Sequence, residues 1–221
     1  MTQNKQIIER FPALDRLEIC HAAFIKRIPG IEVTKDKPEA LALLEKVHRV
    51  AREEIGMEGW PLVSGDQVHG SNIKIIDAAM NDDQEFSGFD GFVTRQRRAA
   101  LGIYVADCCA VYLVDPKTPA AGLVHSGKKG TELNIAKTAI ETMQREFDSN
   151  PADLIVQLSP CIRPPHYEID FAAHIHEQCR AAGVQQIHDC GICTASDLGS
   201  YYSYRAEKGK TGRMLAVLGL I

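Results

Sequence analysis

The segment LGIYVADCCAVYLVDPKTPAAGLVHSG, residues 101–127, decides the fold of this chain. Within it, the runs 101–105, 111–115 and 121–124 are rich in Val, Ile and Tyr, and Gly, Asp and Pro interrupt them. This composition is typical of β-strands that are separated by turns. We therefore predict three short strands in succession.

The sequence on both sides of this segment adds strands and helices. Further strand-like runs occupy residues 72–77, 91–94, 154–158 and 214–220. Apolar spacing and terminal glycines predict helices over residues 36–56, 131–147 and 171–182. The clustering of strands between helices predicts an α/β (α+β) fold, with helices packed on a mixed β-sheet. No repeat or low-complexity linker divides the chain, so we interpret residues 1–221 as a single domain.

Two side chains mark the beginning of the first predicted helix. Asp36 and Glu39 have the spacing of a capping box, in which each side chain accepts a hydrogen bond from the other residue's backbone N–H. We expect Gly56 to end this helix and Gly183 to end the helix over 171–182.

Composition limits the classes of function. The chain has 221 residues, of which 45% are hydrophobic and 24% charged, as in soluble globular proteins. Its net charge of -4 gives no electrostatic reason to expect nucleic acid, and no apolar run is long enough to span a membrane. The polar segment 1–10 lacks the apolar core of a signal peptide, and the seven cysteines therefore suggest cytoplasmic thiols. We expect a cytoplasmic protein.

Three metal-competent side chains lie at or beside predicted strand ends. His69 precedes the strand over 72–77, Cys108 follows the strand over 101–105, and His125 follows the strand over 121–124. Two imidazoles and one thiolate are able to hold zinc or copper and leave one coordination position open, as catalytic sites do. The alternative for each residue alone is ordinary: a hydrogen-bonded histidine, or a cysteine that packs as a small apolar side chain.

Six motifs in the same order give the chain a family resemblance. They are QVHG at 67–70, DGFVT at 90–94, ADC at 106–108, GLVHSG at 122–127, SPCI at 159–162 with Tyr167 and Glu168, and YSYR at 202–205 with TGR at 211–213. This set resembles the YfiH family, also called laccase-domain or multicopper polyphenol oxidase-like proteins. The resemblance extends from about residue 60 to the C-terminus.

The resemblance implies a zinc-dependent purine nucleoside phosphorylase that acts on adenosine, inosine, guanosine or methylthioadenosine and gives the base and ribose 1-phosphate. Some members also deaminate adenosine, and others are described as copper-dependent polyphenol oxidases or as editors of cell-wall precursors. Carried over to this chain, the metal ligands are His69, Cys108 and His125. The implied fold is a layered sandwich of mixed β-sheet and flanking helices, related to a cysteine-dependent toxin domain.

The chain departs from the family text in two places. The usual AGWRG after the second ligand histidine is replaced here by SGKKG at 126–130, so Lys128 and Lys129 stand for Trp and Arg. The early FxxRxGG signature keeps Arg27 but only one of its glycines. Both changes concern substrate preference and turnover, and they leave the metal ligands untouched.

Cationic residues near these motifs are candidates for binding phosphate. Lys128 and Lys129 lie in a small basic loop that leads into a predicted helix N-terminus, which favours anions. Arg205 and Arg213 in the tail motif are candidates for a second anion clamp, and Arg27 is carried over from the early signature. Solvated lysines and surface ion pairs are the ordinary alternatives.

Three carboxylates are candidates for acid–base or positioning roles. Asp107 precedes Cys108, and on an extended backbone its side chain would point away from the cysteine and orient a different partner. Asp90 sits in a turn before a strand, where an ordinary Asp-Gly turn explains it equally well. Glu168 is a candidate for contact with substrate.

Two other functions compete with the phosphorylase. The first is an amide hydrolase linked to cell-wall precursors, with Cys108 as thiolate nucleophile and His125 as base. The second is a homologue that keeps an idle metal site. Copper-dependent phenol oxidation is physically weaker, because one cluster of three ligands does not hold the several coppers that four-electron reduction of oxygen requires. We expect a small nucleoside and phosphate as partners, without nucleic acid or membrane.

Overall fold

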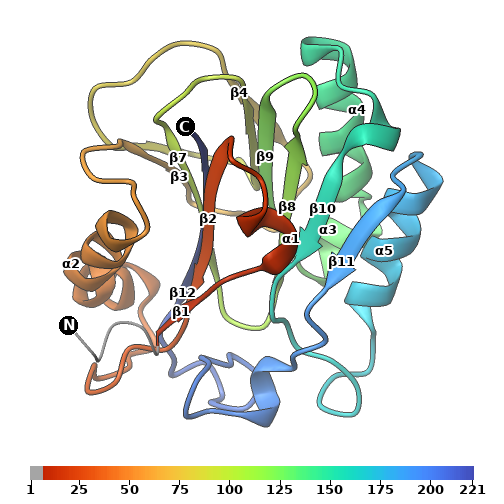
Figure 1. Cartoon of the computed structure of the whole chain (residues 1–221). Coiled ribbons are helices and arrows are strands. Elements are labelled where there is room, and N and C mark those ends of the chain that lie inside the picture. The colour runs from red at the N-terminus through yellow and green to blue at the C-terminus, as the bar shows by residue number, and fades with distance from the viewer. Residues whose placement is uncertain (1–6) are drawn as a thin grey trace.

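The computed structural model describes residues 7–221, which form two six-stranded β-sheets packed face to face between layers of helix (Figure 1). The first part of the polar segment that argued against an export signal, residues 1–6, lies outside the described residues. Sheet A contains, in spatial order, β1 (Ile8–Glu9), β2 (Cys20–Ile25), β12 (Met214–Leu220), β7 (Ala100–Val105), β3 (Leu62–Gly65) and β5 (Gln84–Phe86). Sheet B contains β11 (Gln186–Asp189), β10 (Ile155–Leu158), β8 (Cys109–Asp115), β9 (Ala120–Ser126), β6 (Gly91–Thr94) and β4 (Ile73–Ile76).

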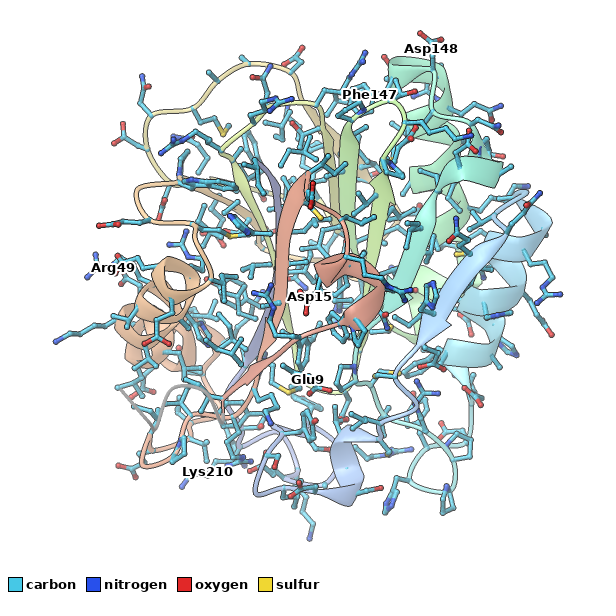
Figure 2. All side chains as sticks on the ribbon, viewed as in Figure 1. Glu9, Asp15, Arg49, Phe147, Asp148 and Lys210 are labelled. Atoms are coloured by element: carbon cyan, nitrogen blue, oxygen red, sulfur yellow. The ribbon has the colours of Figure 1, made fainter. Side chains whose placement is uncertain are left out.

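The helices are α1 (Pro12–Asp15), α2 (Lys37–Glu54), α3 (Lys128–Glu132), α4 (Ile135–Phe147) and α5 (Phe171–Ala181), with short 3-10 turns at Pro151–Asp153 and Thr194–Ser196. The short helix α1 contacts β2 and β10, and its buried residues Ala13 and Leu14 join the core between the sheets. α2 lies outside sheet A, while α4 and α5 lie outside sheet B, so that Arg49 on α2 and Asp148 after α4 sit at opposite edges of the molecule (Figure 2). None of the helices formed by residues 7–221 is long and apolar enough to cross a membrane.

Both sheets are mixed. The sequence predicts a single mixed sheet, and the structure divides the strands between two. In sheet A, β3 runs parallel to β7 and β5, and in sheet B the pairs β10–β11 and β4–β6 are parallel, whereas the remaining pairs are antiparallel. The predicted strands correspond to β4, β6, β7, β8, β9, β10 and β12. The strands that the sequence pattern did not reveal are β1, β2, β3, β5 and β11, which are short or rich in Ala, Gly and polar residues and depend on pairing with a neighbour.

The central strands are buried on both faces. All seven residues of β8 are buried, and so are all seven of β9. On β8, Ala110, Tyr112 and Val114 join the core between the sheets, while Cys109, Val111 and Leu113 pack toward α4 and α5. The Tyr112 hydroxyl, buried between the sheets, donates a 2.7 Å hydrogen bond to the Ala23 carbonyl. Because both faces are covered, these strands are continuously apolar and lack the alternation of half-exposed strands.

The helix predicted over residues 131–147 is two helices. Asn134 adopts left-handed dihedral angles, φ 60° and ψ 39°, and separates α3 from α4. Asn tolerates this conformation better than most residues, so it ends one helix and turns the chain into the next. The first of the two helices, α3, begins at Lys128, three residues before the predicted start.

The ends of α2 largely follow the sequence. The Asp36 carboxylate accepts a 2.8 Å hydrogen bond from the Glu39 backbone N–H, and Gly56 follows the helix with φ +93°. The reciprocal half of the capping box is absent, because the Glu39 carboxylate accepts from the Thr34 hydroxyl at 2.7 Å.

A buried histidine on α2 should make stability depend on pH. His48 is 2% exposed, and neither of its ring nitrogens has a hydrogen-bond partner among residues 7–221. Burial, assisted by Arg52, lowers the pKa of His48 to about 3. In the unfolded chain its pKa returns to about 6.5, so the unfolded state alone binds this proton between those values. The stabilisation is complete above pH ~6.5 and is lost as pH falls, by up to ~1.4 kcal/mol per pH unit.

We expect the His48→Leu variant to lose less unfolding free energy between pH 7.5 and pH 5 than the parent protein, as measured by urea denaturation. His166→Leu, at an exposed histidine, is the control and should keep the parent's pH dependence. An equal loss in His48→Leu and in the parent would show that another group titrates.

Candidate metal centre and its cavity

A cavity of about 1070 Å³ contains the three candidate ligands on its wall. His69 belongs to the loop between β3 and β4, Cys108 to the turn between β7 and β8, and His125 to β9. Their donor atoms all lie within 4.8 Å of one another, and the two imidazole rings meet edge to face with centroids 4.7 Å apart. The structure therefore brings together the three residues that the sequence predicts. β9 continues to Ser126, so His125 lies within the strand rather than beyond its end.

The Asp90 side chain bonds the ring of one candidate ligand, His125, and the backbone of another, His69. Its buried carboxylate lies 2.8 Å from His125 Nδ1 and accepts hydrogen bonds from the backbone N–H groups of His69, at 2.9 Å, and Gly70, at 2.7 Å. With Nδ1 held by Asp90, His125 presents Nε2 to its other neighbours. Asp90 therefore positions the ligands, a role beyond that of an ordinary Asp-Gly turn.

The backbone that carries the ligands is unusual. Gln67 and His69 are left-handed, with φ of 47° and 59°, which few non-glycine residues adopt. The Gln67 amide holds the loop in place, because it donates to the Tyr104 carbonyl at 2.7 Å and accepts from the Tyr104 N–H at 2.9 Å. A Cβ at Gly127 would lie 2.5 Å from the Cys108 sulfur, so only glycine fits there without a shift.

Asp107 does not have the extended backbone on which its predicted orientation depended. Its φ is +84°, and its carboxylate turns toward the C-terminal part of the chain. There it accepts hydrogen bonds from the Thr194 hydroxyl and from the Arg205 backbone N–H, both at 2.7 Å. Asp107 thus ties the Cys108 turn to the loop that carries Arg205.

The thiol and the buried imidazole perturb each other in the absence of a metal. Burial alone raises the pKa of Cys108, but the charge and hydrogen bond of His125 and the hydrogen bond of His69 outweigh it and lower the pKa to about 6. Burial alone lowers the pKa of His125, but Cys108 and Asp90 raise it to about 9. The pair is therefore thiolate and imidazolium at neutral pH, and a metal that binds here displaces the proton of His125.

Cationic side chains surround this centre. The basic residues that line the cavity are Lys37, Lys128, Lys129, Arg205, Lys208 and Arg213. Lys128 and Lys129 are exposed at the start of α3, as the basic loop predicted. Arg205 stacks over the Tyr167 ring at 4.8 Å and forms a 2.6 Å ion pair with Glu168. Glu168 itself is exposed and is not among the residues that line the cavity.

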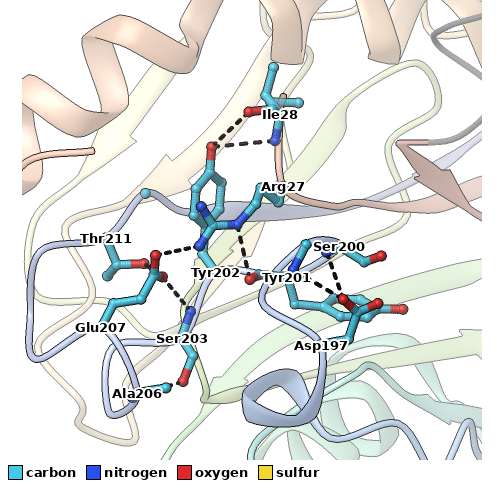
Figure 3. Close-up of polar contacts among 12 residues, drawn as sticks. Arg27, Ile28, Asp197, Ser200, Tyr201, Tyr202, Ser203, Ala206, Glu207 and Thr211 are labelled. Atoms are coloured by element: carbon cyan, nitrogen blue, oxygen red, sulfur yellow. Dashed lines mark hydrogen bonds and ion pairs between the residues drawn. The ribbon is translucent and has the colours of Figure 1, made fainter. Parts of the chain in front are cut away.

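Arg27 is not among the residues that line the cavity, contrary to the prediction that it binds substrate or phosphate. Figure 3 shows the contacts that it makes instead. Its guanidinium forms an ion pair with Glu207, donates to the Tyr201 carbonyl at 3.1 Å and lies over the Tyr202 ring at 4.3 Å. Glu207 in turn accepts from the Ser203 N–H. Arg27 therefore holds in place the loop that carries Tyr204, Arg205 and Lys208. Because Glu207 already neutralises its charge, Arg27 is not available to bind a ligand.

Sequence patterns missed several residues of the cavity wall. Lys37 comes from the first turn of α2 and Tyr104 from β7, and neither stood out because each fits its own helix or strand. Phe171 lines the cavity beside Tyr167, with ring centroids 5.1 Å apart. Tyr204, which lies inside the tail motif, is 57% exposed and also lines the cavity. The motif was the only signal that pointed to it.

Comparison with known proteins gives consistent matches. The family model described as multi-copper polyphenol oxidoreductase laccase matches residues 30–173 and 168–221. The chain is 26% identical over 237 residues to the purine nucleoside phosphorylase ORF3 of Streptomyces griseus, covering 90% of this chain and 94% of that protein. It is 29% identical over 201 residues to the purine nucleoside phosphorylase YlmD of Geobacillus stearothermophilus, covering 74% and 73%.

Solved structures share the fold. The crystal structure of YlmD from Geobacillus stearothermophilus superposes with a TM-score of 0.80 at 21% identity, covering 97% of this chain and 98% of that one. The hypothetical protein YfiH of Bacillus licheniformis also gives a TM-score of 0.80 at 21% identity, with 94% and 98% covered. The layered α+β sandwich with mixed sheets is thus the fold of these proteins.

We expect Asp90→Asn to weaken zinc binding by roughly 10- to 100-fold, because the amide no longer supplies the negative charge that orients and polarises His125. The dissociation constant is measured by competition with a chelating dye. Asp82→Asn, at an exposed aspartate, is the control. Zinc affinity within twofold of the parent protein would exclude this role for Asp90.

Proposed function

This chain belongs to the multi-copper polyphenol oxidoreductase laccase family, and we propose that it is a metal-dependent purine nucleoside phosphorylase. The reaction cleaves the glycosidic bond of a purine nucleoside with phosphate and gives the free base and ribose 1-phosphate. The observation that carries the proposal is the convergence of His69, Cys108 and His125 in a cation-lined cavity. The names of the relatives from Streptomyces griseus and Geobacillus stearothermophilus support it.

The donor set fits zinc. Two imidazole nitrogens and one thiolate suit a borderline-soft ion, and three protein ligands leave a position open for water or substrate. Asp90 supplies the carboxylate that zinc-binding histidines usually have behind them. When bound, zinc would supply a Lewis acid and lower the pKa of a coordinated water to ~7.

The remaining wall of the cavity fits the other parts of the reaction. Tyr167, Phe171 and Tyr204 offer aromatic faces to a purine base. The cations offer charge for phosphate and for the negative charge that develops in the transition state. Lys128 and Lys129, exposed at the mouth, steer the anion inward. Asp107 holds the loop of Arg205, and Glu168 orients the Arg205 guanidinium.

Adenosine deamination is a finer part of this proposal. The same centre would direct water to the amino-bearing carbon of adenine and release inosine and ammonia. Nucleoside phosphorolysis and deamination differ in product, so one analysis separates them.

The test is product analysis by chromatography and mass spectrometry. Zinc-loaded protein is incubated with adenosine, inosine or methylthioadenosine, with and without phosphate. We expect free base that depends on phosphate, and at least a hundredfold loss of rate in His69→Ala, which lacks one metal ligand. Inosine without phosphate would establish deamination. Zinc binding without free base or inosine would exclude both activities and leave an idle metal site.

A second candidate function is favoured by the thiolate–imidazolium pair. Cys108 beside His125 has the lowered pKa of a nucleophilic thiol and suits an amide hydrolase acting on a cell-wall precursor. Copper-dependent phenol oxidation has less support, because residues 7–221 contain one cluster of three or more candidate metal ligands.

Chelation and alkylation separate the two mechanisms. For the phosphorylase, we expect a strong chelator to abolish activity, zinc to restore it, and bound zinc to protect Cys108 from iodoacetamide. For the hydrolase, activity should survive chelation and be lost on alkylation and in Cys108→Ser. Activity that resists both treatments would contradict any role of Cys108 in catalysis.

A further inference from the structure

We propose that Lys37 and Arg213 form an oxyanion subsite on the inner wall of the cavity and that this subsite binds inorganic phosphate. The choice of phosphate as the oxyanion rests on the function proposed above. The location of the subsite follows from the burial of the two cations. Of the six basic residues that line the cavity, these two are the only ones that are not exposed.

The two cations come from chain segments that lie side by side. Lys37 is the first residue of α2, and Arg213 immediately precedes β12. The Thr211 backbone N–H donates a 3.1 Å hydrogen bond to the Thr34 carbonyl, which joins the segments just before each cation. Thr211 is further fixed by its hydroxyl, which donates to Glu207 at 2.6 Å (Figure 3). The positions of Lys37 and Arg213 are therefore set by the fold.

Lys37 has no carboxylate partner within ion-pair distance in the described part of the chain. Its ammonium donates one hydrogen bond, 2.6 Å long, to the Asp66 backbone carbonyl. The Asp66 carboxylate is engaged elsewhere, with the Ser87 hydroxyl at 2.8 Å and the Gly88 N–H at 2.7 Å. Glu85, Asp66 and Asp90 interact with Lys37 electrostatically, but none of these carboxylates forms an ion pair with its ammonium. Two of its three N–H donors therefore remain for a ligand in the cavity.

Arg213 likewise forms no ion pair with a carboxylate among residues 7–221, although Asp107 interacts with it electrostatically. Its Nη1 donates to the carbonyls of Gly212, at 2.9 Å, and Thr211, at 3.4 Å. Its other nitrogens, Nε and Nη2, make no hydrogen bond or ion pair with residues 7–221. A guanidinium held at one nitrogen and open on the others matches two oxygens of a phosphate group.

Electrostatics support an anion between the two. Burial and then the charge of Arg213 lower the pKa of Lys37, and they outweigh the carboxylates of Glu85, Asp66 and Asp90, which raise it. Burial lowers the pKa of Arg213 and outweighs Tyr204, Cys108 and Asp107, which raise it. Two half-buried like charges that share a wall repel each other, and an anion that binds both relieves this repulsion. Arg213 and Cys108 line the same cavity, so the subsite and the candidate metal centre open to one space.

The other cations of the cavity are less suited to this role. Arg205 is paired with Glu168 and stacks on Tyr167. Lys128, Lys129 and Lys208 are exposed, where water screens their charge. They should affect how fast an anion arrives more than how tightly it is held.

The test is calorimetric titration of inorganic phosphate into the full-length protein, with Lys37→Gln, Arg213→Gln and Arg213→Lys at equal zinc content. We expect the two Gln variants to bind phosphate at least tenfold more weakly and Arg213→Lys to retain part of the affinity. Lys46→Gln, on the exposed side of α2, is the matched control and should bind within twofold of the parent. Thermal unfolding and zinc content verify that each variant is folded.

Three results would overturn the subsite. The first is no phosphate binding by the parent protein at millimolar concentration, and the second is parent-like binding by Lys37→Gln and Arg213→Gln. The third is a loss of at least tenfold in Lys128→Gln or Lys129→Gln that is larger than the loss in Lys37→Gln and Arg213→Gln.

Kinetics separate this inference from the proposed function. If phosphorolysis occurs, the KM for phosphate should rise tenfold in the Gln variants while the KM for nucleoside stays within twofold. Phosphate binding that depends on Lys37 and Arg213, without phosphorolysis, would support the subsite and exclude the phosphorylase.

Discussion

The buried carboxylate of Asp90 is the constraint on which the candidate site depends. It bonds His125 Nδ1 and the backbone N–H groups of His69 and Gly70, so one side chain sets the orientation of an imidazole and the course of a neighbouring loop. A fully buried carboxylate is costly unless it is compensated, and here three donors satisfy it. The loop that it holds contains His69 in a left-handed conformation, which is stable only because its surroundings determine it.

The two packed sheets explain why the ligands meet. β8 and β9 are neighbours in the middle of sheet B, and β7 lies in sheet A, so the β7–β8 turn with Cys108 crosses from one sheet to the other. Burial of both faces fixes the register of β8 and β9, because a slip of one residue would exchange the side chains of the two cores. This register places Ala110 opposite His125, two residues from the thiol. Packing of the core thereby sets the geometry of the site.

Charge in the cavity divides into satisfied and unsatisfied groups. Arg27 and Arg205 have carboxylate partners and hold the loop of residues 201–211 in place. Lys37 and Arg213 are held by backbone carbonyls, which position them without neutralising them. The same residue types thus serve structure in one place and remain available to an anion in another, and only the identity of their partners distinguishes them.

The sequence alone determined the strands with continuous apolar runs, the main helices and the three metal donors, because these depend on local composition, on turn residues and on motifs that resemble a family. It did not reveal that the strands form two sheets, because β2 and β3 of sheet A were not predicted. The composition of these two strands is not typical of β-structure, and they form by pairing with distant partners. It placed Arg27 among the substrate contacts and overlooked Lys37. Glu207, which neutralises Arg27, and the Asp66 carbonyl, which holds Lys37, are both distant in the sequence. For Asp90 the sequence left a functional role and an ordinary Asp-Gly turn equally plausible. The contact with His125 distinguishes them, because burial and partners 35 residues away are properties of the tertiary structure.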